Sequence, residues 1–126
     1  MQRTSRPRTP EARDPRPLDA ETMRDTARRL LAEDAEPPSP EELETLTLAL
    51  RGHMMLLVPV VEDAARGLPE DSVPRACARA CIGEARMRLG LAPGGNLPAG
   101  IAHAMRLARS VNALCDHLEN LGGEHP

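Results

Sequence analysis

The sequence predicts an all-α fold, an up-down bundle of four helices, from three observations. Apolar residues recur every three or four positions over most of the chain, which is the spacing of one face of an α-helix. No segment shows the strict alternation of apolar and polar residues that marks a half-buried strand. Segments rich in Pro and Gly separate the periodic stretches, and short connections between consecutive helices favour antiparallel neighbours. The alternative architecture is a three-helix core with a loosely docked first helix.

The predicted bundle occupies residues 18–121, between two segments without apolar periodicity. Residues 1–17 carry five Arg among Pro, Ser and Thr and cannot bury enough apolar surface to offset the entropy lost on ordering, so we predict a disordered tail. Residues 122–126 are predicted to be a flexible C-terminus. The first helix is expected from Leu18 to about Ala35, with Asp19 as its N-cap. Its apolar positions are Ala20, Met23, Ala27, Leu30 and Leu31.

The longest periodic stretch runs from Ser39 to Leu68 and predicts the second helix. Ser39 is its expected N-cap, Pro40 suits the first helical position, and Glu42 completes an S-x-x-E capping box. A strict spacing of three and four residues then predicts a seam that packs lengthwise on other helices. The seam comprises Leu43, Leu46, Leu50, His53, Leu57, Val60 and Ala64.

Two further helices complete the predicted bundle. The third begins after Asp71 or Ser72 as N-cap and runs to Gly90, and its core positions are Ala78, Ile82, Ala85 and Leu89. After a Pro- and Gly-containing loop, Asn96 is the expected cap of a fourth helix from Leu97 to about Leu121. Its seam matches that of the second helix, so the two are expected to pack together. This seam comprises Leu97, Ile101, Ala104, Ala108, Val111, Cys115 and Leu118.

The core must form without aromatic side chains, because the 126 residues include no Phe, Tyr or Trp. Burial depends on Leu, Val, Met, Ala and Cys, of which the larger contribute about 1.5–3 kcal/mol each. Since so small a core leaves a narrow margin of stability, we expect a homo-oligomer or a protein partner.

Charge is unevenly distributed along the chain. Residues 18–72 carry five Arg and thirteen acidic residues, whereas residues 73–110 carry six Arg and one Glu. The two halves could attract each other within one bundle, or the basic half could be a docking surface. The candidate partner-binding ridge on the third helix is Arg75, Arg79 and Arg86. Nucleic acid is an unlikely partner, because no aromatic residue exists to stack a base and an acidic helix precedes the ridge.

Two polar residues lie on or beside the predicted seams. His53 is expected to be a core residue bonded to a backbone group, with a ligand-binding role as the alternative. Asn112 is expected to fix the register of the helices. A ridge of His103, Ser110 and His117 on the fourth helix is expected to be a solvated flank.

Cys77 and Cys81 lie four residues apart on the third helix, so two thiolates could reach one metal ion if His53 or Cys115 completed the site. Such cysteines beside an apolar stripe are more often small buried hydrophobes, and we expect packing residues and no cofactor. No G-x-S-x-G, H-E-x-x-H, P-loop or G-x-G-x-x-G motif is present, so no catalytic constellation supports an enzyme.

The expected location is the cytoplasm. Three cysteines are too few for a disulfide framework, and the N-terminus has no apolar run typical of a signal peptide. The longest apolar run, Met54 to Val61, is shorter than the roughly 20 residues that cross a bilayer, so no membrane span is expected.

Three segments within Glu41 to Leu121 carry a resemblance to a known family. They read LRGHMMLLVPVVE at residues 50–62, VPRACARACIGEARMRL at 73–89 and LPAGIAHAMRLARSVNALCDHLENL at 97–121. The chain resembles a small actinomycete family of unknown molecular function, labelled as natural-product-biosynthesis proteins. All sixteen basic residues are Arg, which agrees with a GC-rich genome. The resemblance implies a setting in secondary metabolism and supplies no catalytic residues.

The sequence therefore predicts a non-enzymatic accessory or protein-interaction module, linked to natural-product biosynthesis or its regulation. The alternatives are a thiol or metal-site sensor using Cys77 and Cys81, and a DNA-binding regulator.

Overall fold

The computed structural model describes residues 19–122 as four helices. They are α1 (Ala20–Leu31), α2 (Pro40–Arg66), α3 (Val73–Leu89) and α4 (Leu97–Gly122). Within this range there is no strand, and the predicted all-α bundle is confirmed. The predictions of a disordered tail at residues 1–17 and a flexible C-terminus at 122–126 lie outside the described residues, except that Gly122 ends α4.

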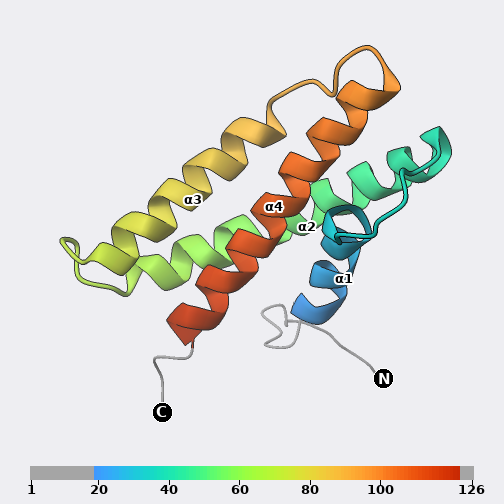
Figure 1. The fold of residues 1–126 in the computed structure, drawn as a ribbon. Coiled ribbons are helices and arrows are strands. Elements are labelled where there is room, and N and C mark those ends of the chain that lie inside the picture. Colours follow the sequence, from blue (N-terminus) through green and yellow to red (C-terminus); the bar gives the residue numbers. More distant parts are fainter. Residues whose placement is uncertain (1–18, 123–126) are drawn as a thin grey trace, which may run out of the picture.

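The helix α4 is the common partner of the other three. It contacts α1, α2 and α3, whereas α1 and α3 share no contact within the described residues. Figure 1 shows α4 running across α2, with α3 on one side and α1 on the other, and successive helices alternate in direction. The first helix buries Met23, Ala27 and Leu30. It is therefore an integral part of the bundle, and not the loosely docked helix of the alternative architecture.

Each helix starts at an N-cap that the sequence predicted, although α1 begins at Ala20 and ends at Leu31, whereas the prediction was Leu18 to about Ala35. Side-chain oxygens accept the backbone N–H three residues on, which satisfies a donor that has no partner within the helix. The four caps are Asp19 to Thr22 at 3.1 Å, Ser39 to Glu42 at 3.1 Å, Ser72 to Arg75 at 3.3 Å, and Asn96 to Ala99 at 2.9 Å. The alternative cap Asp71 is not used for α3.

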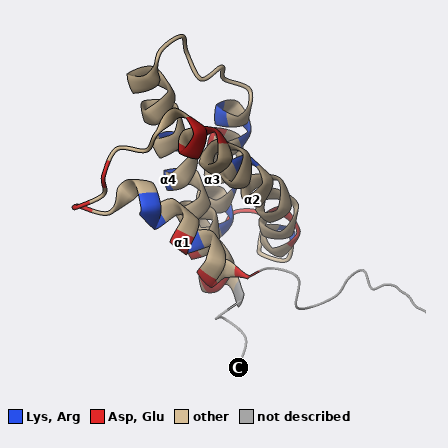
Figure 2. Ribbon diagram, turned by 90° about the vertical axis from the view of Figure 1, so that its right-hand side faces the viewer, with Lys and Arg blue, Asp and Glu red and all other residues tan. Residues whose placement is uncertain are grey.

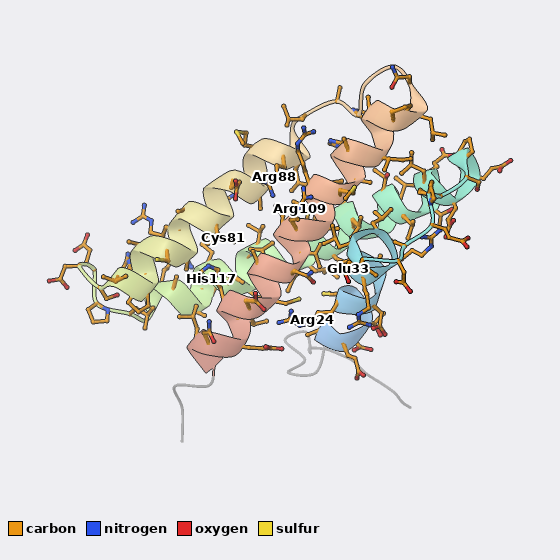
Figure 3. All side chains as sticks on the ribbon, in the orientation of Figure 1. Arg24, Glu33, Cys81, Arg88, Arg109 and His117 are labelled. Carbon is orange, nitrogen blue, oxygen red and sulfur yellow. The ribbon has the colours of Figure 1, made fainter. Side chains whose placement is uncertain are left out.

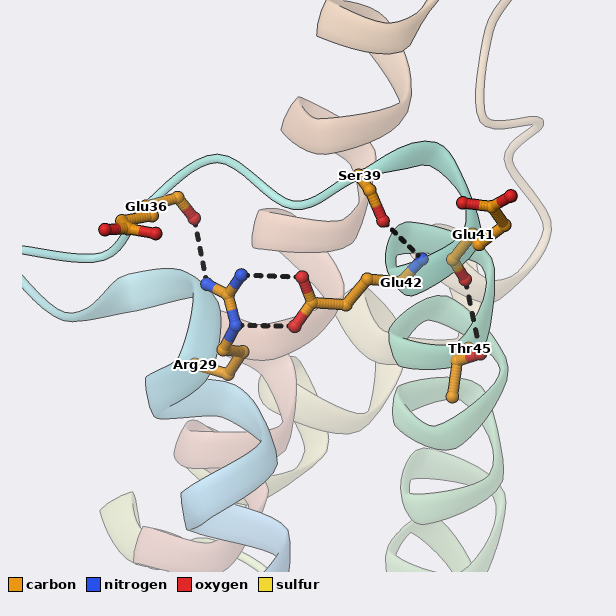
Figure 4. Close-up of polar contacts among 6 residues, drawn as sticks. All are labelled: Arg29, Glu36, Ser39, Glu41, Glu42 and Thr45. Carbon is orange, nitrogen blue, oxygen red and sulfur yellow. Dashed lines mark hydrogen bonds and ion pairs between the residues drawn. The ribbon is translucent and has the colours of Figure 1, made fainter.

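The side chain of Glu42 contacts a second helix as well as its own N-cap. Its two carboxylate oxygens accept hydrogen bonds from Nε and Nη2 of Arg29, both at 2.7 Å, and Arg29 also donates to the carbonyl of Glu36 at 2.9 Å (Figure 4). The hydrogen bond from Arg29 lowers the pKa of the Glu42 carboxyl, and the backbone N–H of Ser39 lowers it further, as the predicted capping box requires. A bidentate pair of this kind fixes both distance and orientation, so it clamps the end of α1 to the start of α2.

The buried face of α2 departs from the predicted seam. Only Leu50 and Leu57 of that seam are fully buried, while His53 is half-buried at its edge. A straight helix has 3.6 residues per turn, so its buried face rotates by about 20° per heptad relative to a strict 3.5-residue repeat. Toward the end of α2 the buried residues therefore lie one position after the predicted seam residues. The buried residues of α2 are Leu50, Met54, Leu57, Val58, Val61 and Ala65.

The fourth helix is buried over a wider arc than its seam, because it packs against three helices. Leu107 and Leu114 are fully buried, and so are two members of the ridge that was predicted to be solvated, His103 and Ser110, each 3% exposed. That prediction was wrong for both residues, and His117 is half-buried. The predicted core of α3 is confirmed for Ala78, Ile82 and Ala85.

By length and composition α2 could cross a membrane, since one 18-residue window has a mean hydropathy of 1.3. This is weak evidence, because core helices of soluble proteins pass the same test. The absence of a membrane span and the cytoplasmic location stay predictions.

Candidate functional site

The three arginines that the sequence singled out on the third helix lie around one cavity. Arg75, Arg79 and Arg86 line a cavity of about 300 Å³ between α2 and α3. A fourth arginine, Arg66, reaches it from the last turn of α2. We refer to this cavity as the arginine cleft. Its complete lining is Glu62, Ala65, Arg66, Arg75, Arg79, Ile82, Gly83 and Arg86.

Arg66 was missed in the sequence because it lies on a different helix from the ridge. The signal that could have found it is the shortness of the connection between Gly67 and Ser72, which forces the end of α2 and the start of α3 to lie side by side. A basic residue in the last turn of a helix is also favoured by the helix dipole, so its position has a local reason as well.

The floor of the arginine cleft is apolar and partly open. Ala65 and Ile82 are buried beneath it. Gly83 is exposed, and a Cβ atom built there would have no other atom within 4 Å. The glycine therefore leaves room beside the guanidinium groups for an apolar part of a ligand.

Three of the four guanidinium groups have a protein partner. Arg86 Nη2 lies 3.1 Å from the carboxylate of Glu62, Arg75 Nη1 donates to the carbonyl of Leu68 at 3.1 Å, and Arg66 pairs with Asp63. Arg79 is exposed and has no hydrogen-bond or ion-pair partner among residues 19–122. One carboxylate thus lines the cleft with four guanidinium groups, and this surplus of positive charge suits an anionic ligand.

The pair between Arg86 and Glu62 also bears on the uneven charge along the chain. It joins the basic third helix to the acidic second helix, as expected if the two halves attract each other within one bundle. Arg79 and the unused donors of Arg75 remain directed to the cleft surface. The attraction within the bundle therefore occupies only part of the basic ridge.

His53 lies on the side of α2 that faces α1, away from the arginine cleft. Its Nε2 is 3.3 Å from the hydroxyl of Thr26, and that hydroxyl donates to the carbonyl of Thr22 at 3.1 Å. Because the hydroxyl proton is committed to Thr22, the imidazole must donate through Nε2. Burial lowers the pKa of His53, which favours the neutral ring. The predicted bond to a backbone group was therefore wrong, because a side-chain hydroxyl from α1 takes that place.

Asn112 and the two cysteines of α3 lie in separate regions of the bundle. Asn112 is half-buried between α1 and α4, beside Arg24 and Arg28, where its role in fixing register stays a prediction. Cys77 is exposed and Cys81 half-buried, and both are on α3 (Figure 3 labels Cys81).

A metal site is not assembled from these residues. His53 faces α1 and does not join Cys77 and Cys81, and no group of three or more His, Cys, Asp or Glu within residues 19–122 could hold a metal ion. Burial raises the pKa of the Cys81 thiol and also that of the Cys115 thiol. Both therefore favour the protonated form, which is a poor nucleophile and a poor metal ligand.

A partly buried polar contact between α3 and α4 was also not foreseen. Arg88 Nη1 donates to the hydroxyl of Ser110 at 3.0 Å and to the carbonyl of Arg106 at 3.1 Å, and Nη2 pairs with Glu84 at 3.1 Å. Figure 3 shows Arg88 between the two helices. The contact explains how a serine is accommodated on the buried face of α4.

His103 lies on the same helix and has no hydrogen-bond partner among the residues that the structure describes, although it is 3% exposed. Burial lowers the pKa of His103, and the charges of Arg51 on α2 and Arg106 on α4 lower it further. The ring is therefore held neutral inside the bundle.

The fold and the site define an all-α four-helix protein with a basic cleft and no assembled metal site or catalytic motif in its described part. The chain belongs to a family of unknown function, DUF6415, whose model matches residues 21–123. No curated protein and no solved structure matches the sequence significantly.

Proposed function

We propose that this protein is a non-enzymatic protein-interaction module that binds an acidic segment of a protein partner in the arginine cleft. The observation that carries the proposal is the gathering of four arginines around a cavity of about 300 Å³ that contains one carboxylate. Guanidinium groups bind carboxylates with paired, charge-assisted hydrogen bonds, which are stronger than hydrogen bonds between neutral groups. Arg79 is exposed on the cleft and has no hydrogen-bond or ion-pair partner among residues 19–122, so it can bind such a partner without breaking a contact within that range.

The spread of the arginines favours a chain of acidic residues over one compact anion. Arg75 and Arg86 are eleven residues apart on α3, which corresponds to about 16 Å along the helix axis. A single phosphate can bind one or two guanidinium groups over this length, whereas acidic side chains spaced along a peptide can bind all of them. The apolar floor at Ile82 and the space beside Gly83 would accept an apolar side chain between the charges.

The wider setting that we propose is an accessory role in natural-product biosynthesis, or its regulation, in the cytoplasm of an actinomycete. The support is the resemblance carried by residues 50–62, 73–89 and 97–121, together with the exclusive use of Arg as the basic residue. The thiol-sensor alternative is disfavoured by the burial that raises the pKa of the Cys81 thiol. A DNA-binding role is disfavoured because the arginines surround a cleft that also holds the carboxylate of Glu62.

The test is the binding of a fluorescent Glu- and Asp-rich peptide to the full chain, followed by fluorescence anisotropy at low salt. We expect binding that weakens as salt is added, and a loss of at least about tenfold in affinity for Arg79→Glu, because a charge-assisted contact becomes a repulsion.

Arg109→Glu is the matched control, because Arg109 is exposed on α4, does not line the cleft, and changes the net charge by the same amount. The proposal is rejected if a peptide with Gln and Asn in place of the acids binds equally well, or if Arg79→Glu and Arg109→Glu weaken binding to the same extent.

A further inference from the structure

The chain carries an acidic surface of its own at the junction of its first two helices. Glu33 and Asp34 form the turn after α1, and Glu41 and Glu44 lie in the first two turns of α2. We refer to these four residues as the acidic corner. All four are exposed, and none has an ion-pair partner among residues 19–122. Figure 2 shows acidic residues on the projecting connection between α1 and α2.

The neighbouring Glu42, unlike the residues of the acidic corner, has an ion-pair partner. That carboxylate is occupied by the bidentate pair with Arg29, which clamps α1 to α2 (Figure 4). The clamp joins the last turn of α1 to the first turn of α2, on either side of the connection that carries Glu33 and Asp34. It therefore reduces the entropy that this connection would lose on binding a partner.

The acidic corner and the arginine cleft of one molecule cannot meet. Glu41 and Arg66 are near the two ends of α2, and their separation of twenty-five positions corresponds to about 37 Å along the axis. Each molecule therefore presents a negative surface at one end and a positive cleft at the other. Because the two surfaces are different, one contact between copies leaves a cleft and a corner free, so it can be repeated into an open chain or a ring; an antiparallel dimer in which both contacts form is the closed alternative.

We infer that the arginine cleft binds the acidic corner of a second copy, so that copies of this chain associate head to tail. The inference rests on the proposed function and names the partner of the same site. Charge complementarity supports it, since Glu33 and Asp34 are exposed on the turn after α1 and Arg79 is exposed on the cleft. Exposed ion pairs are individually weak and are screened by salt, so the association is favoured at low ionic strength and high protein concentration.

The first measurement is the average mass of the full chain by light scattering. At low salt the mass should exceed 13.6 kDa and rise with protein concentration, and at high salt it should return to the mass of the monomer. Arg79→Glu and the double variant Glu33→Arg/Asp34→Arg should each remain monomeric at low salt, whereas the control Arg109→Glu should associate like the wild type.

The decisive measurement mixes the two defective variants. Arg79→Glu retains an intact acidic corner, and Glu33→Arg/Asp34→Arg retains an intact cleft, so an equal mixture should form a dimer of twice 13.6 kDa that grows no further. A mixture that stays monomeric overturns the inference, even if the wild type self-associates. Circular dichroism of each variant confirms that it is folded before mixing.

Other outcomes separate this inference from the proposed function. A wild type that stays monomeric at low salt, yet binds the acidic peptide through Arg79, overturns the head-to-tail contact and leaves the proposed function standing. A dimer that persists at high salt and in Arg79→Glu also overturns it, and points instead to the exposed apolar side chains of α2, Leu48, Met55 and Leu56.

Discussion

Replacement of Arg88 by Met should destabilise the bundle by about 2–3 kcal/mol. The methionine keeps the apolar stem of the side chain in place but removes the guanidinium group. Two of the lost hydrogen bonds join α3 to α4. The bond to the hydroxyl of Ser110 is partly buried, and a hydrogen bond to a charged group contributes about 1.5–3 kcal/mol, whereas the bond to the carbonyl of Arg106 is exposed to water and adds little. The pair with Glu84 adds little, because that carboxylate is 53% exposed and exposed ion pairs contribute about 0–1 kcal/mol.

The loss of stability in Arg88→Met depends on which hydrogen-bonding groups stay buried without a partner. Ser110 is 3% exposed, so without Arg88 its hydroxyl loses a partner that water cannot readily replace. If that cost is part of the effect, Ser110→Ala in the Arg88→Met background should recover about 1 kcal/mol, whereas Ser110→Ala alone should be destabilising by about 1 kcal/mol.

Urea unfolding of the wild type, both single variants and the double variant provides the four free energies. The reasoning is refuted if Arg88→Met costs less than about 0.5 kcal/mol, or if the two changes add without any coupling.

Three further outcomes follow from the geometry of single side chains. His53→Leu should be neutral or destabilising by about 1 kcal/mol in chemical unfolding, because it loses the hydrogen bond to Thr26, and a gain of more than 1 kcal/mol would indicate a residue kept for a ligand. Stability should fall as pH drops below 6.5, since burial lowers the pKa of His103 and that of His53 in the folded state, so that the unfolded chain binds more protons. His103→Gln should remove the part of this dependence that His103 contributes, and an unchanged pH profile in urea titrations would contradict this. Native alkylation followed by mass spectrometry should modify exposed Cys77 first and buried Cys115 last, and early modification of Cys115 would show that α4 opens readily.

The helices and their starts could be predicted because the signals that determine them are local. The caps Ser39, Ser72 and Asn96 act on backbone groups three residues away, so the sequence alone places them. The alignment of Arg75, Arg79 and Arg86 was equally accessible, since residues of one helix share a face through its own periodicity.

What the sequence could not provide depends on contacts between helices. His103 and Ser110 were placed on a solvated flank, because periodicity shows one apolar face and does not show that α4 packs against three helices. Glu42 illustrates the same limit, since its motif predicted the capping box with Ser39 but not the bidentate pair with Arg29 of α1. In both cases a contact with another helix was added that local sequence does not show.

Because α1 and α3 are separated by the other two helices, substitutions on one of them should not disturb the other. The two helices share no contact within the described residues and communicate only through α2 and α4. Substitutions on the outer faces of α1 and α3 should therefore have additive effects on stability, as is usual for distant sites without shared partners. Substitutions in the lining of the arginine cleft on α3 should therefore leave the clamp between α1 and α2 intact.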